Sequence, residues 1–168
     1  DGCTFNENMA VDLAVDGSTL AVTNSTVENG SVEGLFEDKD IIKSTITVDG
    51  VKLIRVAHSG SQCFKTLQDA VDAAEGGTAV TYIYVDCDAT GAGVVIDKNV
   101  AINFNGFTYT LNAPVGSTGT ESNGFQILSG NTVELSNGTL KVADDAADKF
   151  YILVQNYADL TVDGMTLD

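Results

Sequence analysis

Tryptophan is absent from this 168-residue chain, and proline and histidine occur once each. Lysine and arginine together number 8 against 24 acidic residues, so the formal net charge is −16. A surface this negative repels phosphate backbones and anionic headgroups, so the composition excludes nucleic-acid binding and disfavours an anionic membrane. No run approaches the roughly 18 consecutive apolar residues of a membrane span, and we expect no membrane insertion.

Cysteine is scarce as well. Cys3, Cys63 and Cys87 are too few and too scattered for a disulfide framework or a zinc site. A single bond between Cys63 and Cys87 is the expected pairing, because the two flank one helix-plus-strand unit. Three buried or idle thiols are the alternative.

The beginning of the sequence has no basic segment followed by an apolar run, so no signal peptide is visible. Three sequons begin at Asn24, Asn29 and Asn137, and Thr, Ser and Asn are abundant. These features are typical of extracellular proteins. We therefore expect a mature or excised segment of an extracellular or cell-surface protein.

A short repeat recurs along the chain. Its pattern is apolar–x–apolar, then Asp or Asn, then Gly, and copies begin at Leu13, Ile46, Ile102 and Leu160, with a longer-cornered copy at Val133. Strict alternation predicts strands with one buried face. The Asp/Asn-Gly corner tolerates positive φ and turns the chain sharply.

Two architectures fit this repeat. In an antiparallel sandwich the corners would be hairpin turns. In a parallel β-solenoid each repeat would be one rung, and a single proline suits such a fold because most backbone donors are needed in ladders. The spacing of the copies favours the solenoid.

One segment has helical rather than strand periodicity. We predict a helix near residues 64–75, because its apolar side chains fall on one stripe: Phe64, Leu67, Ala70, Val71 and Ala74. Thr66 or Ser61 can cap its start, and Gly76 ends it. Such a helix would cover the first rung of a solenoid.

Residues 64–111 resemble the entry of a pectin-lyase-like right-handed parallel β-helix. The resemblance is carried by the helix Thr66–Ala74, the strand Thr81–Asp86 and the segment Gly93–Gly106, and residues 125–135 and 151–167 continue the pattern. It implies an all-β right-handed parallel β-helix with one capping α-helix near residues 64–75. Proteins of this kind include polysaccharide lyases and hydrolases, phage tail spikes and bacterial surface proteins.

This resemblance also suggests how the chain is organised. Residues 57–168 would contain the capping helix and the rungs. Residues 1–56 would be a strand-rich segment, either rungs of a preceding unit or of a stacked one. The end of the chain, Leu167-Asp168, continues plausibly into its start, so we expect a piece of a longer chain or a unit that stacks head to tail; a closed monomer is the alternative.

A calcium site is the best metal candidate. Asp86, Asp88 and Asp97, with Thr90 and Gly91 between them, echo the spacing of a calcium loop. The segment is flanked by a predicted strand and a predicted rung, whereas a helix–loop–helix calcium site is flanked by two helices. The alternative is an Asp/Gly-rich connecting turn.

A glycan-binding surface is the second candidate. If alternate residues of the strand 81–86 face the core, Tyr82 and Tyr84 face outward as a neighbouring pair. Such tyrosines could form an aromatic platform for sugars, and ordinary half-buried packing is the alternative.

Catalytic residues are hard to find. The lone arginine, Arg55, precedes the predicted helix, the lone histidine is His58, and the adjacent pair Asp144-Asp145 falls in a polar loop. We therefore expect a non-enzymatic structural or adhesive module of an extracellular surface protein or fibre, whose partners are copies of itself or surface glycans. A glycan-binding or polysaccharide-cleaving module, including a phage spike fragment, is the alternative, and calcium is the only cofactor that the sequence suggests.

Overall fold

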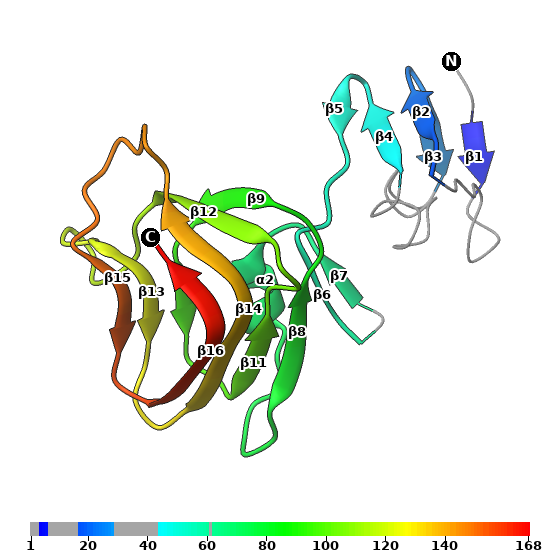
Figure 1. Cartoon of the computed structure of the whole chain (residues 1–168). Coiled ribbons are helices and arrows are strands. Elements are labelled where there is room, and N and C mark those ends of the chain that lie inside the picture. The colour runs from blue at the N-terminus through cyan, green and yellow to red at the C-terminus, as the bar shows by residue number, and fades with distance from the viewer. Residues whose placement is uncertain (1–3, 7–16, 29–43, 61) are drawn as a thin grey trace. The chain divides into compact units, whose positions relative to one another are not determined.

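The computed structural model describes residues 4–6, 17–28, 44–60 and 62–168 (Figure 1). The chain divides into two compact units, residues 1–55 and 56–168, and each is described by itself. Cys3, Asn29 and the repeat copy that begins at Leu13 lie outside the described residues. Within the described ranges, no helix is long and apolar enough to cross a membrane.

The first unit contains short strands, which are β1 (Thr4–Asn6), β2 (Thr19–Val22), β3 (Thr26–Glu28), β4 (Thr45–Val48) and β5 (Val51–Lys52). β1 pairs with β3 and β2 with β4, both in parallel, whereas β4 and β5 are antiparallel. Asp49 and Gly50 join β4 to β5 with φ angles of +48° and +82°, as a tight hairpin turn requires. The turn predicted at this Asp-Gly corner is confirmed.

The second unit contains one helix among its described residues, and its other elements are strands. They are β6 (Ala57–Ser59), β7 (Gln62–Phe64), α2 (Leu67–Asp72), β8 (Thr81–Val85), β9 (Ala89–Ala92), β10 (Val94–Ile96), β11 (Val100–Asn103), β12 (Thr108–Ala113), β13 (Asn123–Ile127), β14 (Thr132–Val142), β15 (Ile152–Asn156) and β16 (Asp159–Leu167). β10, β13 and β15 form one sheet, and a larger mixed sheet runs β7-β6-β8-β11-β14-β12-β9, with β16 paired to β14.

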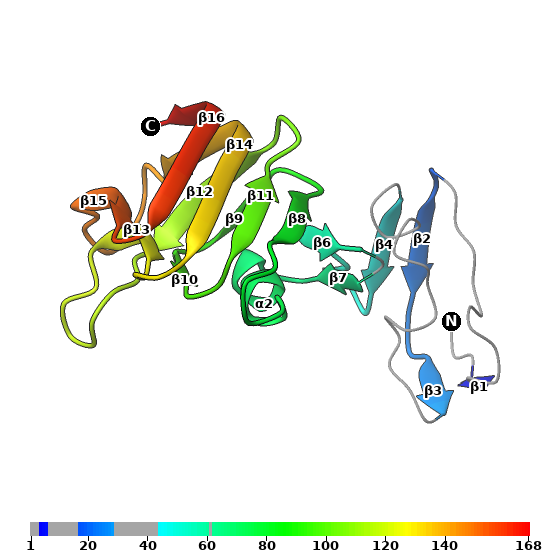
Figure 2. The ribbon, with the colours of Figure 1, turned by 90° about the horizontal axis from the view of Figure 1, so that it is seen from below.

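In the larger sheet, β8, β11, β14 and β16 are parallel, in register and side by side (Figure 2). Side chains alternate between the two faces because the strand period is two. One inner-face row consists of Ile83, Ile102, Leu135 and Val162. One outer-face row consists of Tyr84, Asn103, Ser136 and Asp163.

The sheet curls around the core like half of a barrel (Figure 1). The curl arises at β14, which pairs with β11 along its first half and with β12 along its second. Between the halves lies Asn137, whose φ of +56° bends the strand. Asn105, at +51°, occupies the corresponding corner between β11 and β12, and its side-chain Nδ2 donates to the Val85 carbonyl at 2.9 Å.

The prediction of a right-handed parallel β-helix, or solenoid, is wrong. The sheets are mixed, since β6 is antiparallel to both β7 and β8, and β4 is antiparallel to β5. A parallel pair needs a long crossover, but β6 and β7 are separated by only residues 60 and 61, which forces them antiparallel. The antiparallel sandwich is also wrong at most corners. After Asn105 and Asn137 the chain continues into strand segments that do not pair with the segment before the corner, so these corners are not hairpin turns.

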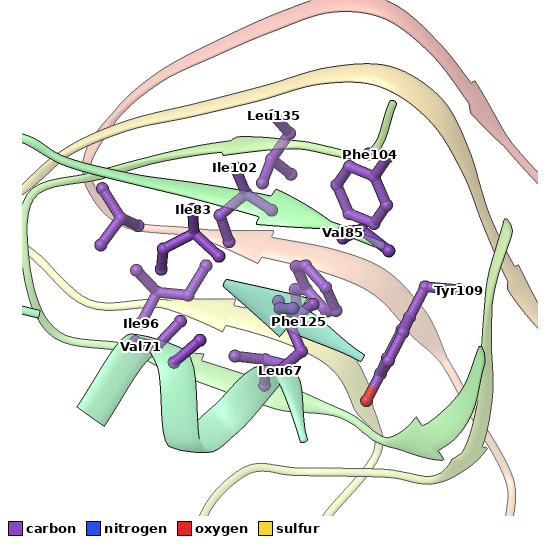
Figure 3. Packing of buried hydrophobic residues seen from close by; sticks show 14 of the residues in the cluster. Leu67, Val71, Ile83, Val85, Ile96, Ile102, Phe104, Tyr109, Phe125 and Leu135 are labelled. Carbon is purple, nitrogen blue, oxygen red and sulfur yellow. The ribbon is translucent and has the colours of Figure 1, made fainter. Parts of the chain in front are cut away.

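The helix α2 is shorter than the predicted 64–75. Phe64 belongs to β7, where it pairs with Ala57, so the helix begins later. Thr66 is its N-cap, and the Thr66 hydroxyl accepts from the Asp69 N–H at 3.0 Å, as the sequence indicates. Leu67 and Val71 are completely buried against the sheet core (Figure 3).

The core of the second unit fills the hollow of the curled sheet. Its largest fully buried side chains include Phe104 and Phe125, whose ring centroids lie 6.5 Å apart, and Tyr109 meets Phe125 edge to face at 6.2 Å (Figure 3). Helix α2 covers one side of this core. The opposite side ends at β15 and β16.

Candidate functional site

Tyr82 and Tyr84 lie on the outer face of β8, as the alternation predicts. Ile83 and Val85 between and after them are fully buried, whereas Tyr82 is 61% exposed and Tyr84 is half-buried. Tyr82 is therefore the side chain of this pair that solvent or a ligand can reach.

His58 completes this part of the outer face. Strand β6 places His58 opposite Tyr84, and the two rings stack with centroids 5.1 Å apart and planes 19° apart. The His58 Nδ1 lies 2.7 and 2.9 Å from the two carboxylate oxygens of Asp86. An ionised carboxylate only accepts, so Nδ1 carries the proton and donates it. The three residues Tyr84, His58 and Asp86 thus form a polar and aromatic cluster beside the exposed Tyr82.

Sequence reasoning missed His58 because its partner comes from a different strand. The histidine precedes Asp86 by 28 residues, and only the antiparallel pairing of β6 with β8 brings the two together. The alternation does indicate part of this cluster, since Tyr82, Tyr84 and Asp86 are two residues apart and therefore lie on one face of the strand.

The structure does not bring the three predicted calcium ligands together. Asp86 binds His58, the Asp88 carboxylate accepts from the Thr108 N–H at 2.7 Å, and Asp97 is exposed in the link between β10 and β11. Over the described part of the chain, no group of three or more His, Cys, Asp or Glu side chains could hold a metal ion. Asp86 and Asp88 instead bind the His58 ring and the Thr108 backbone N–H.

The predicted Cys63–Cys87 bond stays a prediction. Cys63 lies on β7 opposite His58, and Cys87 follows the end of β8, so strand β6 separates the two strands. Mass spectrometry of the protein alkylated without reduction tests the bond.

A cleft of about 160 Å³ opens beside Tyr109, with Val56, Gln68 and residues 90–93 among those that line it. The Tyr109 hydroxyl donates to the Ala92 carbonyl at 2.9 Å, and burial raises the pKa of Tyr109 to about 12. Gly91 is required here, since a Cβ would lie 2.3 Å from that hydroxyl. Ligand sites are usually about 300 Å³ or larger, so the cleft is small for one.

The far side of the sheet has an open edge. β16 pairs with β14, and β15 with β13, and among the described residues neither has a second partner. Apolar side chains are correspondingly uncovered: Ile152 is 41% exposed, Val162 44% and Leu167 47%. We call β15 and β16 together the tail edge.

Unpaired backbone groups and uncovered apolar side chains make the tail edge a template for another strand. The Asp159 N–H donates to the Asn131 carbonyl of the loop before β14, so Asp159 and, by alternation, Thr161 direct their backbone groups toward β14. Leu160 and Val162 therefore direct theirs outward. The edge offers both hydrogen-bonding groups and an apolar face.

No family model, curated protein or solved structure matches this chain significantly. The resemblance to pectin-lyase-like proteins therefore stays a prediction, and the parallel β-helix that it implied is corrected above.

Proposed function

We propose that this chain is a non-enzymatic structural or adhesive module of an extracellular surface protein or fibre, and that it associates through the tail edge. The observation that carries the proposal is the exposure of Val162 and Leu167, whose partners on β14, Leu135 and Leu140, are completely buried. Burying an exposed Val or Leu side chain stabilises an assembly by about 1.5–3 kcal/mol.

The surface chemistry supports an extracellular location. Asn24 and Asn137 each begin a sequon, and both side chains are exposed. On the outer face, Asn103 is half-buried and Asp163 is exposed, and such polar side chains suit a solvated surface.

Association is tested by sedimentation velocity of the full chain over a range of concentrations. We expect reversible, concentration-dependent oligomers. Val162→Lys should weaken association about tenfold or more, because a charge would point into the apolar face that a partner must cover. The matched control is Thr161→Lys, which places the same charge one residue earlier on the outer face. A monomeric wild-type chain at every concentration would overturn the proposal.

Glycan binding is a second candidate, and the exposed Tyr82 beside the Tyr84–His58–Asp86 cluster favours it. Aromatic faces stack on sugar rings, and the neighbouring polar groups can bind hydroxyls. A glycan array probed with the full chain should give hits that Tyr82→Ala abolishes. The control is Tyr157→Ala, since Tyr157 is 60% exposed and lies between β15 and β16. Equal loss with both variants would count against a site at Tyr82.

A further inference from the structure

The described part of the first unit also has strands that are paired on one side. Among the described residues, β2 pairs with β4 and β1 pairs with β3, each in parallel and each on one side. We call β1 and β2 together the head edge. The Val22 carbonyl accepts from the Asp49 N–H of the turn that follows β4, so by alternation the backbone groups of Ala21 point away from β4.

Strand β2 repeats strand β14 position by position. The segment Thr19–Asn24 reads Thr-Leu-Ala-Val-Thr-Asn, and Thr132–Asn137 reads Thr-Val-Glu-Leu-Ser-Asn. Both end on an asparagine with positive φ, +50° at Asn24 and +56° at Asn137. β14 is paired on both sides, by β11 and β16, whereas among the residues that the structure describes β2 pairs with β4 alone.

The neighbours of these strands also match. The segment Ile46–Gly50 reads Ile-Thr-Val-Asp-Gly on β4, and Leu160–Gly164 reads Leu-Thr-Val-Asp-Gly on β16, so the two differ only at the first residue. A strand with this sequence therefore already pairs in parallel with β2 in the first unit and with β14 in the second unit.

The backbone groups at the two edges are complementary in one register. If Val162 lies opposite Val22, the Val162 N–H meets the Ala21 carbonyl, and the Ala21 N–H meets the Leu160 carbonyl. Both donors and both acceptors point outward from their own sheets, as a parallel pair requires. The inner-face row of Ile102, Leu135 and Val162 then continues into Val22 and Val48 of the next chain.

We propose that the tail edge of one copy is covered by the head edge of a second copy, in parallel, with Val162 opposite Val22. This inference rests on the proposed association through the tail edge and names its partner. The contact joins two different surfaces, so each copy keeps one free edge after pairing and the same contact can repeat from copy to copy. Because each copy has a net charge of −16, raising the salt concentration should strengthen the contact by screening repulsion.

A complementation experiment with the full chain tests the partner. Val162→Lys blocks the tail edge, and Ala21→Pro blocks the head edge by removing the outward N–H while leaving the β4 ladder. Each variant alone should be monomeric, and an equal mixture should form a heterodimer and nothing larger. Ala21→Val, which keeps the N–H, is the control and should assemble like the wild type.

The outcomes separate the two proposals. If Ala21→Pro alone still forms dimers and Val162→Lys does not, the tail edges pair with each other, and the head-to-tail inference is overturned while association through the tail edge stands. If the wild type is monomeric, both proposals fail.

A second measurement does not depend on Ala21→Pro folding. Ala21→Cys and Thr161→Cys chains, mixed and oxidised, should form an intermolecular disulfide, because these outer-face positions are opposite each other in the register. Each chain oxidised alone measures the background from the native cysteines. A mixture of Ala21→Cys with Asp163→Cys, which is out of register, should give less product. Equal yields from both mixtures would overturn the register.

Discussion

Strands β14 and β16 carry the same repeat in the same register, yet their apolar side chains have different surroundings. Leu135 on β14 is completely buried, whereas its partner on β16, Val162, is 44% exposed. The difference is the second neighbour: β14 lies between two sets of strands, and among the described residues β16 has β14 alone. Alternation shows which side chains face inward, but a further layer of chain decides whether they are buried.

The other side of the same core shows how such a face is closed. Helix α2 inserts Leu67 and Val71 under the sheet, and β6 and β7 add antiparallel strands beside β8. The tail edge has no equivalent cover among the described residues.

The largest difference in stability should come from shortening two side chains of the inner-face row to alanine. Leu135→Ala should destabilise the second unit by about 3 kcal/mol, because it leaves a cavity in a fully buried site. Val162→Ala should cost less than about 1 kcal/mol, since that side chain is partly in water already. Urea unfolding at low protein concentration measures both. Similar costs for the two variants would show that β16 is covered like β14.

Substitution of the two corner glycines, Gly138 and Gly164, should likewise cost more stability in the closed interior than at the open edge. A Cβ at Gly138 would lie 2.3 Å from the Phe104 Cβ and 2.6 Å from the Phe107 carbonyl oxygen, so Gly138→Ala should cost about 2–3 kcal/mol. Gly164, at φ +61°, occupies the kind of corner where Asn137 has +56°, so Gly164→Asn should change stability by less than about 0.5 kcal/mol. Thermal unfolding of the two variants checks this, and a large loss in Gly164→Asn contradicts it.

Tyr109 provides a pH test of the closed interior. Burial raises its pKa to about 12, so between pH 10 and 12 the folded chain keeps a proton that the unfolded chain loses. Its contribution to stability is complete below pH 10 and is lost as pH rises toward 12, by about 2–3 kcal/mol.

Tyr109→Phe should therefore remove this part of the stability loss at alkaline pH. At neutral pH it should cost about 1 kcal/mol, because the hydrogen bond to the Ala92 carbonyl is missing. Urea unfolding at stepped pH measures the difference. A Tyr109→Phe chain that loses as much stability between pH 10 and 12 as the wild type would contradict the assignment.

The smallest effect concerns the cover of the core. Thr66→Ala removes the N-cap of α2 and should cost about 1 kcal/mol in urea unfolding, whereas Thr66→Ser keeps the acceptor and should cost much less. No loss in Thr66→Ala would mean that packing of Leu67 and Val71 alone holds the helix.

Local features of the fold could be read from the sequence. The alternation identified the inner and outer residues of β8, the Asp49-Gly50 corner is a tight turn, and Thr66 caps the helix. These features depend on near neighbours in the chain, where residue type acts directly on the backbone.

The direction in which strands pair could not be read in this way. Similar corners lead to a hairpin at Asp49 and to a continuing bent strand at Asn137, because the choice depends on which segment is available to hydrogen-bond afterwards. The His58–Asp86 contact has the same origin, since it needs the antiparallel pairing of β6 and β8.

By itself, the sequence determined that this chain is acidic, rich in strands and built on an alternating repeat with Asp/Asn-Gly corners. Only the tertiary structure decided that the sheets are mixed, that His58 joins Asp86, and that Val162 is uncovered while Leu135 is buried. The reason is physical: alternation and φ preference act within a few residues, whereas burial and strand direction arise from pairs far apart in the chain.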